Sequence, residues 1–221
     1  MSIAKDHIRL DYFFDPFCGW CYASAPAAKG MAEHFGEQLH MQPSGLFANE
    51  RPVSSIVNHA YKNDIRIGQL TGQVFSEAYH QEVMRAPDGV FSSMPSTLAL
   101  VALGELDTAL EPQFLHQVQI ARYVHGRDTS RVEEVVAVAR TVAGSGLDVA
   151  VLGERLRTDE GLFRKTNERI ARTQAMMQTL QLSGVPLLLM TRGIDRKLIQ
   201  GQDLYAGADH LVGLLNELAR T

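Results

Sequence analysis

The feature that most constrains this chain is its pair of cysteines, the only two in 221 residues, which stand three positions apart in Cys18-Gly19-Trp20-Cys21. Two thiols at this spacing can close into a disulfide and reopen with little backbone movement. Residues 8–14 before the pair are aromatic and branched, as in a strand, and residues 22–32 after it are rich in alanine and favour a helix. The sequence therefore predicts a strand-to-helix turn, with Cys18 at or just before the first helical residue.

This position predicts different roles for the two thiols. The first amide groups of a helix have no intrahelical partner and carry partial positive charge, which stabilises a thiolate at Cys18. Cys21 lies one turn further along and is expected to remain a thiol until it is needed. We therefore expect Cys18 to attack a partner sulfur and Cys21 to resolve the mixed disulfide. The alternative is a pair of buried structural cysteines or a static disulfide.

A zinc site is a second alternative, because Cys18, Cys21, His34 and His40 fit the spacing C-x2-C-x12-H-x5-H. A zinc finger places its cysteines on a hairpin and its histidines on one helix, whereas here a helix is expected to begin at the cysteines and Gly36 separates the histidines. The net charge of −4 and the lack of a basic stripe argue against a nucleic-acid partner. We therefore predict no metal and no cofactor.

Composition sets the compartment that we expect. A hydrophobic content of 45% in 221 residues is enough to bury a full core. Residues 1–7 lack the apolar run of a signal peptide, and the aliphatic run near Leu187 is too short to cross a bilayer. Both cysteines are committed to one site, so no structural disulfide remains, which suits a reducing compartment. The prediction is a cytoplasmic protein without a membrane partner.

The order of predicted elements gives an α/β fold with an insertion. A weaker strand is expected within residues 37–46, and a long block of helical patterns follows, including a helix opened by a capping box of Ser130 and Glu133. Asp148 is expected to cap a short helix, and Thr158-Asp159-Glu160 to cap a long one. Strands at 185–190 and 194–199 and a last helix complete the chain. We predict a discontinuous domain, 1–48 and 158–221, that builds a mixed sheet, and an all-helical insertion domain at 49–157.

This order, with Cys-x-x-Cys at the start of the first helix, resembles the thioredoxin fold, and the helical insertion resembles the DsbA-type family of thiol–disulfide oxidoreductases. Residues 14–22 are similar to the FrnE-like branch of that family. Gly184-Val185-Pro186 resembles the family's cis-proline loop, which faces the dithiol. The resemblance implies an enzyme, an oxidoreductase or disulfide isomerase, that acts on protein or small-molecule thiols, glutathione included. The dipeptide Gly19-Trp20 differs from the Gly-Pro of thioredoxins and leaves the redox direction open.

The resemblance and the residue chemistry together give a candidate site. Pro186 in a cis bond would present the backbone of Val185 to an extended substrate. Asp15 is a candidate acceptor for the proton of Cys21, with a turn or capping role as the alternative. Three aromatic residues are candidates for an apolar substrate rim, with packing on the sheet as the alternative for the first and last: Phe17, Trp20 and Tyr22.

Two other functions stay open. Kappa-class glutathione transferases and 2-hydroxychromene-2-carboxylate isomerases resemble the chain in having the insertion, but they typically present serine at the position of Cys18. A non-enzymatic, chaperone-like binding protein could use the dithiol as a redox switch. The sequence leaves the oligomeric state open between a monomer and a homodimer.

Overall fold

The computed structural model describes residues 8–220; residues 1–7, on which the expectation about a signal peptide depends, lie outside them. The strands are β1 (Ile8–Phe14), β2 (Leu39–Pro43), β3 (Arg51–Pro52), β4 (Val90–Phe91), β5 (Leu187–Arg192) and β6 (Asp195–Ile199). The helices are α1 (Gly19–Ala23), α2 (Ala25–Phe35), α3 (Val57–Thr71), α4 (Met94–Gly104), α5 (Leu110–Tyr123), α6 (Val132–Ala143), α7 (Val149–Thr158), α8 (Glu160–Thr179), α9 (Gln202–Tyr205) and α10 (Ala208–Leu218).

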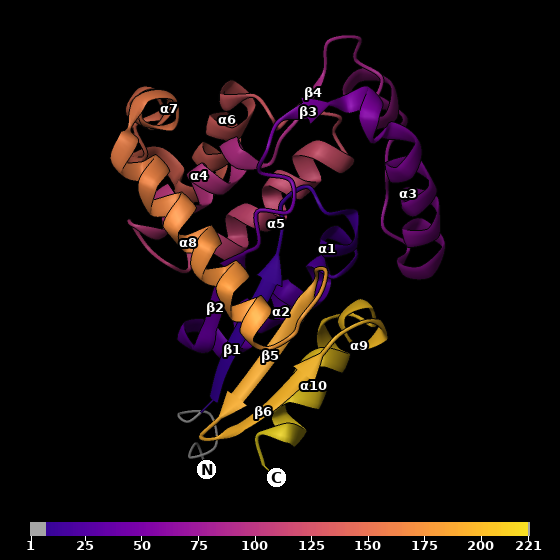
Figure 1. Cartoon of the computed structure of the whole chain (residues 1–221), viewed down its shortest axis with the longest axis vertical. Coiled ribbons are helices and arrows are strands. Elements are labelled where there is room, and N and C mark those ends of the chain that lie inside the picture. The colour runs from indigo at the N-terminus through magenta and orange to yellow at the C-terminus, as the bar shows by residue number, and fades with distance from the viewer. Residues whose placement is uncertain (1–7, 221) are drawn as a thin grey trace.

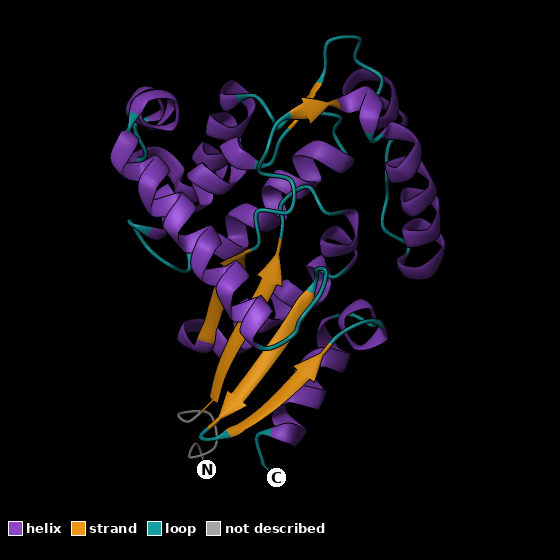
Figure 2. Cartoon of the chain, in the orientation of Figure 1, coloured by secondary structure: helices purple, strands orange, loops and turns teal. Residues whose placement is uncertain are grey.

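Four strands form a mixed sheet in the order β2-β1-β5-β6, seen in the lower half of the molecule in Figures 1 and 2. The central strand β1 runs parallel to β2 and antiparallel to β5, with Leu10 opposite both Leu39 and Met190. Helices cover both faces of this sheet, so six of the seven residues of β1 are buried. This is the mixed sheet that the sequence predicts.

The two faces of the sheet bury different side chains of β1. Leu10, Tyr12 and Phe14 point toward α2 and α10, whereas Phe13 joins a separate cluster with residues of β5 and the end of α8. Figure 1 shows α8 crossing in front of the sheet, with α2 and α10 behind it. Because successive side chains of β1 point to opposite faces of the sheet, this one strand packs against helices on both sides.

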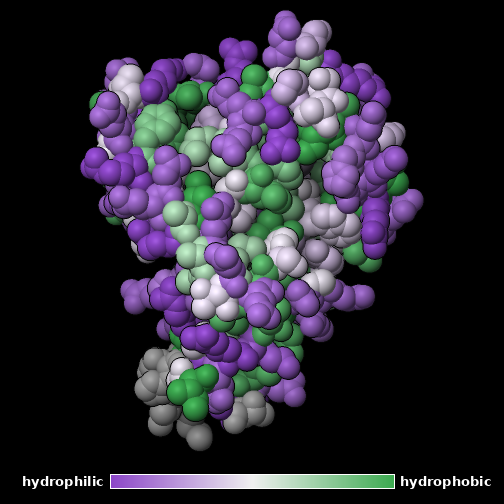
Figure 3. All heavy atoms as spheres, viewed as in Figure 1, coloured by the Kyte–Doolittle hydropathy of each residue, from purple (hydrophilic) through white to green (hydrophobic). Residues whose placement is uncertain are grey.

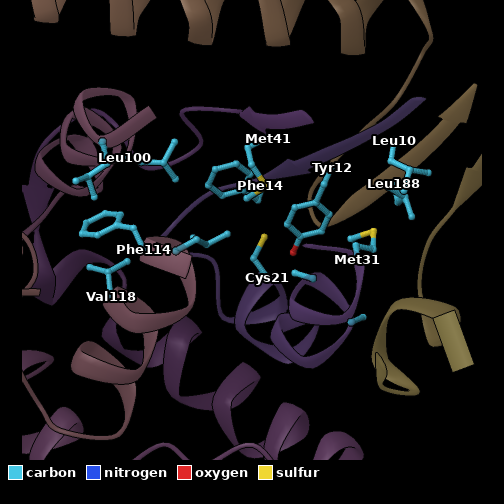
Figure 4. Close-up of a cluster of buried hydrophobic side chains, with 14 of the residues drawn as sticks. Leu10, Tyr12, Phe14, Cys21, Met31, Met41, Leu100, Phe114, Val118 and Leu188 are labelled. Atoms are coloured by element: carbon cyan, nitrogen blue, oxygen red, sulfur yellow. The ribbon is translucent and has the colours of Figure 1, made fainter. Parts of the chain in front are cut away.

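The core that contains Cys21 extends from the sheet into the helical block. Figure 4 shows Phe14 and Met41 of the sheet beside Leu100 of α4 and Phe114 of α5, with Cys21 on the same side as Tyr12. Because one apolar cluster spans both parts, the helices of the insertion support the segment that carries the cysteines. The boundaries predicted at residues 48/49 and 157/158 stay a prediction, since α8 packs against both α4 and β2.

The inserted block is helical from α3 to α7, but it also contains a small ribbon that the sequence pattern missed. Strands β3 and β4 pair antiparallel over two residues each, Arg51 opposite Phe91 and Pro52 opposite Val90. Two-residue strands are too short to show alternation, so an all-helical block was the wrong expectation there.

Two predicted helix caps are confirmed and one is wrong. Asp148 and Asp159 accept hydrogen bonds from the first amides of α7 and α8. Ser130 instead donates to the carboxylate of Asp128 at 2.6 Å, and α6 begins after Arg131 without a side-chain cap. Within residues 8–220, no helix combines the length and the apolar character that crossing a membrane requires.

Candidate active site

The first cysteine lies where the sequence places it, at the start of α1. Cys18 is the N-cap residue with extended backbone angles (φ −79°, ψ 113°), and its carbonyl oxygen accepts the amides of Cys21 and Tyr22 at 2.9 and 3.1 Å. The helix pauses at Ser24 and resumes as α2, which carries Pro26 in its first turn. Cys18 therefore lies at the end of the loop that follows β1 and immediately precedes the first residue of α1.

The two thiols differ in access. Both cysteines are free; the side chain of Cys18 keeps 6% of its surface exposed, whereas Cys21 is fully buried. The Sγ of Cys18 donates to the carbonyl oxygen of Val185 at 3.5 Å, and the Val185–Pro186 peptide bond is cis. The structure thus brings together four residues that the sequence singled out, Cys18, Cys21, Val185 and Pro186, from opposite ends of the chain.

Burial is also the main reason why Cys21 stays protonated. Loss of solvent raises the pKa of the Cys21 thiol well above its usual range, and a hydrogen bond with the Cys18 side chain raises it further. The Ser24 hydroxyl donates to the carbonyl oxygen of Cys21 at 3.0 Å, so it accepts the Tyr12 hydroxyl at 2.7 Å. This chain of hydrogen bonds fixes the end of α1 against the central strand β1.

Asp15 is fully buried beneath the loop that leads to Cys18. Its carboxylate accepts the amides of Phe17 and Phe47 at 2.9 and 3.0 Å and the Ser93 hydroxyl at 3.1 Å. Burial raises its pKa, and the three hydrogen bonds oppose that shift. The carboxylate therefore organises the loop and ties it to α4; a part in proton transfer from Cys21 stays a prediction.

Two of the three predicted rim residues lie beneath the surface, which corrects that expectation. Phe17 packs edge-on against Phe91 with ring centroids 5.2 Å apart, and Tyr22 stacks on Tyr123 at 4.8 Å. The Tyr22 hydroxyl donates to the carbonyl oxygen of Val74 at 3.3 Å. Their partners come from the inserted block, so packing against it, and not only against the sheet, buries both rings.

Trp20 is the aromatic residue that stays partly exposed beside the thiols. Its indole Nε1 donates to the side-chain oxygen of Asn63 at 3.0 Å, and its ring lies 5.3 Å from that of Tyr205. The guanidinium carbon of Arg66 lies 5.5 Å from the centre of the indole ring. Side chains of α3 and α9 therefore hold Trp20 at the surface.

Gly19 allows α3 to approach this closely. A Cβ atom at this position would lie 3.1 Å from the Cδ1 of Ile67 and 3.6 Å from the Oδ1 of Asp64. An alanine at this position would require the Cδ1 of Ile67 to shift by a few tenths of an ångström. The glycine of the dipeptide thus has a packing role against a helix that comes almost fifty residues later.

Sequence reasoning missed a buried charged group behind the site. Arg122 is 1% exposed, its guanidinium carbon lies 3.8 Å from the ring centre of Phe17, and one nitrogen lies 3.6 Å from Asp128. Asp64 is buried nearby, and burial raises the pKa of its carboxyl to about 7, although the charge of Arg122 opposes this. The one signal was a charged residue at a helical position between apolar neighbours, Ala121 and Tyr123.

The residues of the zinc alternative are not gathered in one place. His34 lies near the end of α2, where its Nδ1 is 3.0 Å from the carbonyl oxygen of Gly30, and His40 lies on β2. Across residues 8–220, no three histidine, cysteine or acidic side chains are placed to hold a metal ion. A cavity of about 780 Å³ between α2, α5 and α6 is lined by neither cysteine.

Comparison with known proteins identifies the class that this fold and dithiol define. Residues 9–219 match the DSBA-like thioredoxin domain family, and the chain belongs to this family. It is a DsbA-like thiol–disulfide oxidoreductase with a thioredoxin-like sheet and a helical insertion. A search of curated proteins found no match.

Solved structures give more specific likenesses. The cytosolic disulfide reductase DsbM from Pseudomonas aeruginosa is 27% identical, with a TM-score of 0.84 over 96% of this chain and 100% of that one. The same protein with GSH superposes with a TM-score of 0.81 and 27% identity over 95% and 98% of the chains. BdbD from Bacillus subtilis, 10% identical, shares the fold with a TM-score of 0.56 over 100% and 91%.

Proposed function

We propose that this protein reduces disulfides with the Cys18-Gly19-Trp20-Cys21 dithiol and draws its electrons from a small thiol such as glutathione. The observation that carries the proposal is the asymmetry of the pair: Cys18 is the N-cap residue of a helix, keeps 6% of its surface exposed and lies against Val185, whereas Cys21 is fully buried. Such an arrangement suits one attacking and one resolving thiol.

Each turnover has four thiol–disulfide exchanges. The Cys18 thiolate attacks one sulfur of the substrate disulfide, forms a Cys18–substrate disulfide and releases the other half as a thiolate, which takes up a proton. Cys21 then loses its proton and attacks the Sγ of Cys18, so that the second substrate thiolate leaves and the Cys18–Cys21 disulfide forms. Two molecules of glutathione restore the dithiol and become one molecule of oxidised glutathione.

Two likenesses support the reducing direction and the thiol. The 27% identical relative is named a cytosolic disulfide reductase, and one of its structures contains GSH. By that likeness we also place the present protein in the cytoplasm, where a glutathione pool keeps thiols reduced. The raised pKa of Cys21 fits the same direction, because the buried thiol holds its proton until the mixed disulfide has formed.

The test is turnover of bis(2-hydroxyethyl) disulfide and of insulin with glutathione as electron donor. The native protein should accelerate both reactions, and Cys18→Ser should fall to the uncatalysed rate. Cys21→Ser should slow insulin reduction, because glutathione must then release the mixed disulfide in place of Cys21. An inactive native protein would contradict the proposal, and glutathione conjugation of 1-chloro-2,4-dinitrobenzene by the native protein would favour the transferase alternative.

A further inference from the structure

The exposed side of Trp20 carries an arginine next to the reactive thiols. The guanidinium of Arg66 lies over the indole ring, and the ring of Tyr205 meets the same indole at an angle of 39°. Asn63, one helical turn before Arg66, fixes the indole by its hydrogen bond with Nε1. A cation and two aromatic rings thus share one surface beside Cys18.

The charge of Arg66 is not neutralised by the protein. Among the described residues, no carboxylate forms an ion pair with it. The helix that carries it, α3, exposes two formal cations, Lys62 and Arg66, and its one acidic residue, Asp64, is buried. Across the indole on α9, the carboxylate of Asp203 lies 3.0 Å from the Nε2 of His210. On the α3 side of Trp20, Arg66 is therefore an exposed cation without a carboxylate partner among the described residues.

We propose that Arg66 forms a subsite for a carboxylate of a small disulfide substrate, with Trp20 as the floor on which that substrate lies. This inference rests on the proposed function and adds the chemical class of the substrate: short peptide disulfides with a free carboxylate, of which oxidised glutathione is the probe. A guanidinium binds a carboxylate through two parallel hydrogen bonds. When the guanidinium of Arg66 stacks on the indole, the N–H groups at the edge of the guanidinium remain free to form them.

The short separation of Cys18 and Trp20 along the chain suits a substrate of this size. Trp20 follows Cys18 by two residues in the same turn of chain, and an extended tripeptide spans about 10 Å. A substrate sulfur at Cys18 therefore leaves its carboxylates within reach of the neighbouring α3 surface. Figure 3 shows hydrophobic residues gathered in the hollow between α8 and α3.

The test compares two disulfides that differ in charge. The rate at which the reduced protein is oxidised, followed by loss of free thiol, is measured with oxidised glutathione and with bis(2-hydroxyethyl) disulfide. Arg66→Gln should lower the second-order rate constant with oxidised glutathione about five- to tenfold, as expected for loss of one charge-assisted contact, and leave the uncharged disulfide unaffected. Arg66→Lys should recover part of the loss, and Lys62→Gln, the matched control on α3, should behave like the native protein.

Added salt should reproduce the pattern, because screening weakens an exposed contact with a carboxylate. Equal losses with both disulfides in Arg66→Gln would assign Arg66 a structural role and overturn the subsite, as would an unchanged rate with oxidised glutathione. An inert native protein would contradict the proposed function instead.

Binding of S-methylglutathione, which cannot exchange disulfides, tests the subsite without any reaction. Calorimetry should give a dissociation constant about five- to tenfold weaker for Arg66→Gln than for the native protein. Equal affinities would overturn the subsite whatever the activity of the dithiol.

Discussion

At the scale of single residues, the account depends on how differently two cysteines in one turn are placed. Cys18 is the N-cap of α1 and keeps 6% of its surface exposed, whereas Cys21 is enclosed by the core and its pKa is raised. We infer the two roles from these positions on the helix rather than from the motif.

Alkylation tests that asymmetry. Iodoacetamide added to the reduced, folded protein at neutral pH should label Cys18 well before Cys21, because only thiolates react and Cys21 is both buried and protonated. Peptide mapping by mass spectrometry measures the two rates. In urea the two cysteines should react alike; preferential labelling of Cys21 in the folded protein would reverse the assignment.

The buried arginine makes a separate prediction. Arg122→Ala removes a side chain that is almost fully buried against Phe17 and leaves a cavity, so the free energy of unfolding should fall by about 3 kcal/mol. Arg127→Ala, which breaks a half-exposed ion pair with Glu134, should cost less than about 1 kcal/mol. Urea unfolding measures both, and similar losses would refute the structural importance of Arg122.

At the scale of elements, α3 of the insertion contacts Gly19 and Trp20, the two residues between the cysteines. Ile67 and Asp64 approach Gly19, and Asn63 and Arg66 hold Trp20. The pairing could not be predicted from sequence, because the contacting residues are about 45 positions apart and periodicity reports only which face of a helix is apolar.

Asp64 gives α3 a pH dependence whose sign can be stated. Its pKa is about 7 in the folded protein and near the ordinary value of 3.8 in the unfolded chain, so the folded state binds more protons between these values. Its contribution therefore lowers stability as pH rises from 4 to 8. At pH 8 the free energy of unfolding of Asp64→Asn should exceed that of the native protein by about 1–3 kcal/mol. This difference should vanish near pH 4, where the Asp64 carboxyl is protonated in the folded protein.

Unfolding in urea across this pH range measures the difference. Asp88→Asn, at an exposed carboxylate, is the control and should follow the native protein at every pH. If the free energies of unfolding of Asp64→Asn and the native protein differed by the same amount at every pH, Asp64 would not titrate in this pH range.

At the scale of the whole molecule, the sequence predicts most of what the chain does locally. The strand-to-helix turn at Cys18 and the caps at Asp148 and Asp159 follow from local residue chemistry and are confirmed. The resemblance to the DsbA-type family implies the cis bond before Pro186, which the structure contains.

What the sequence could not predict depends on contacts between the two halves of the fold. The sequence predicts Phe17 and Tyr22 on the substrate rim, but Phe91 and Tyr123 of the insertion pack against them and bury them. Burial of an aromatic residue beside a motif depends on partners seventy to a hundred positions away. The same is true of Arg122, whose neighbours come from several separate segments.

Trapping of the mixed disulfide distinguishes an attacking Cys18 and a resolving Cys21 from the reverse assignment. Cys21→Ser and Cys18→Ser are incubated with oxidised glutathione, and the intact masses are read without reductant. The account predicts one stable glutathionyl group per chain on Cys21→Ser, mapped to Cys18, because the attack that would release it has been removed. Cys18→Ser should stay unmodified, since its remaining thiol is buried. Equal modification of both variants, or modification of Cys18→Ser alone, would contradict the account.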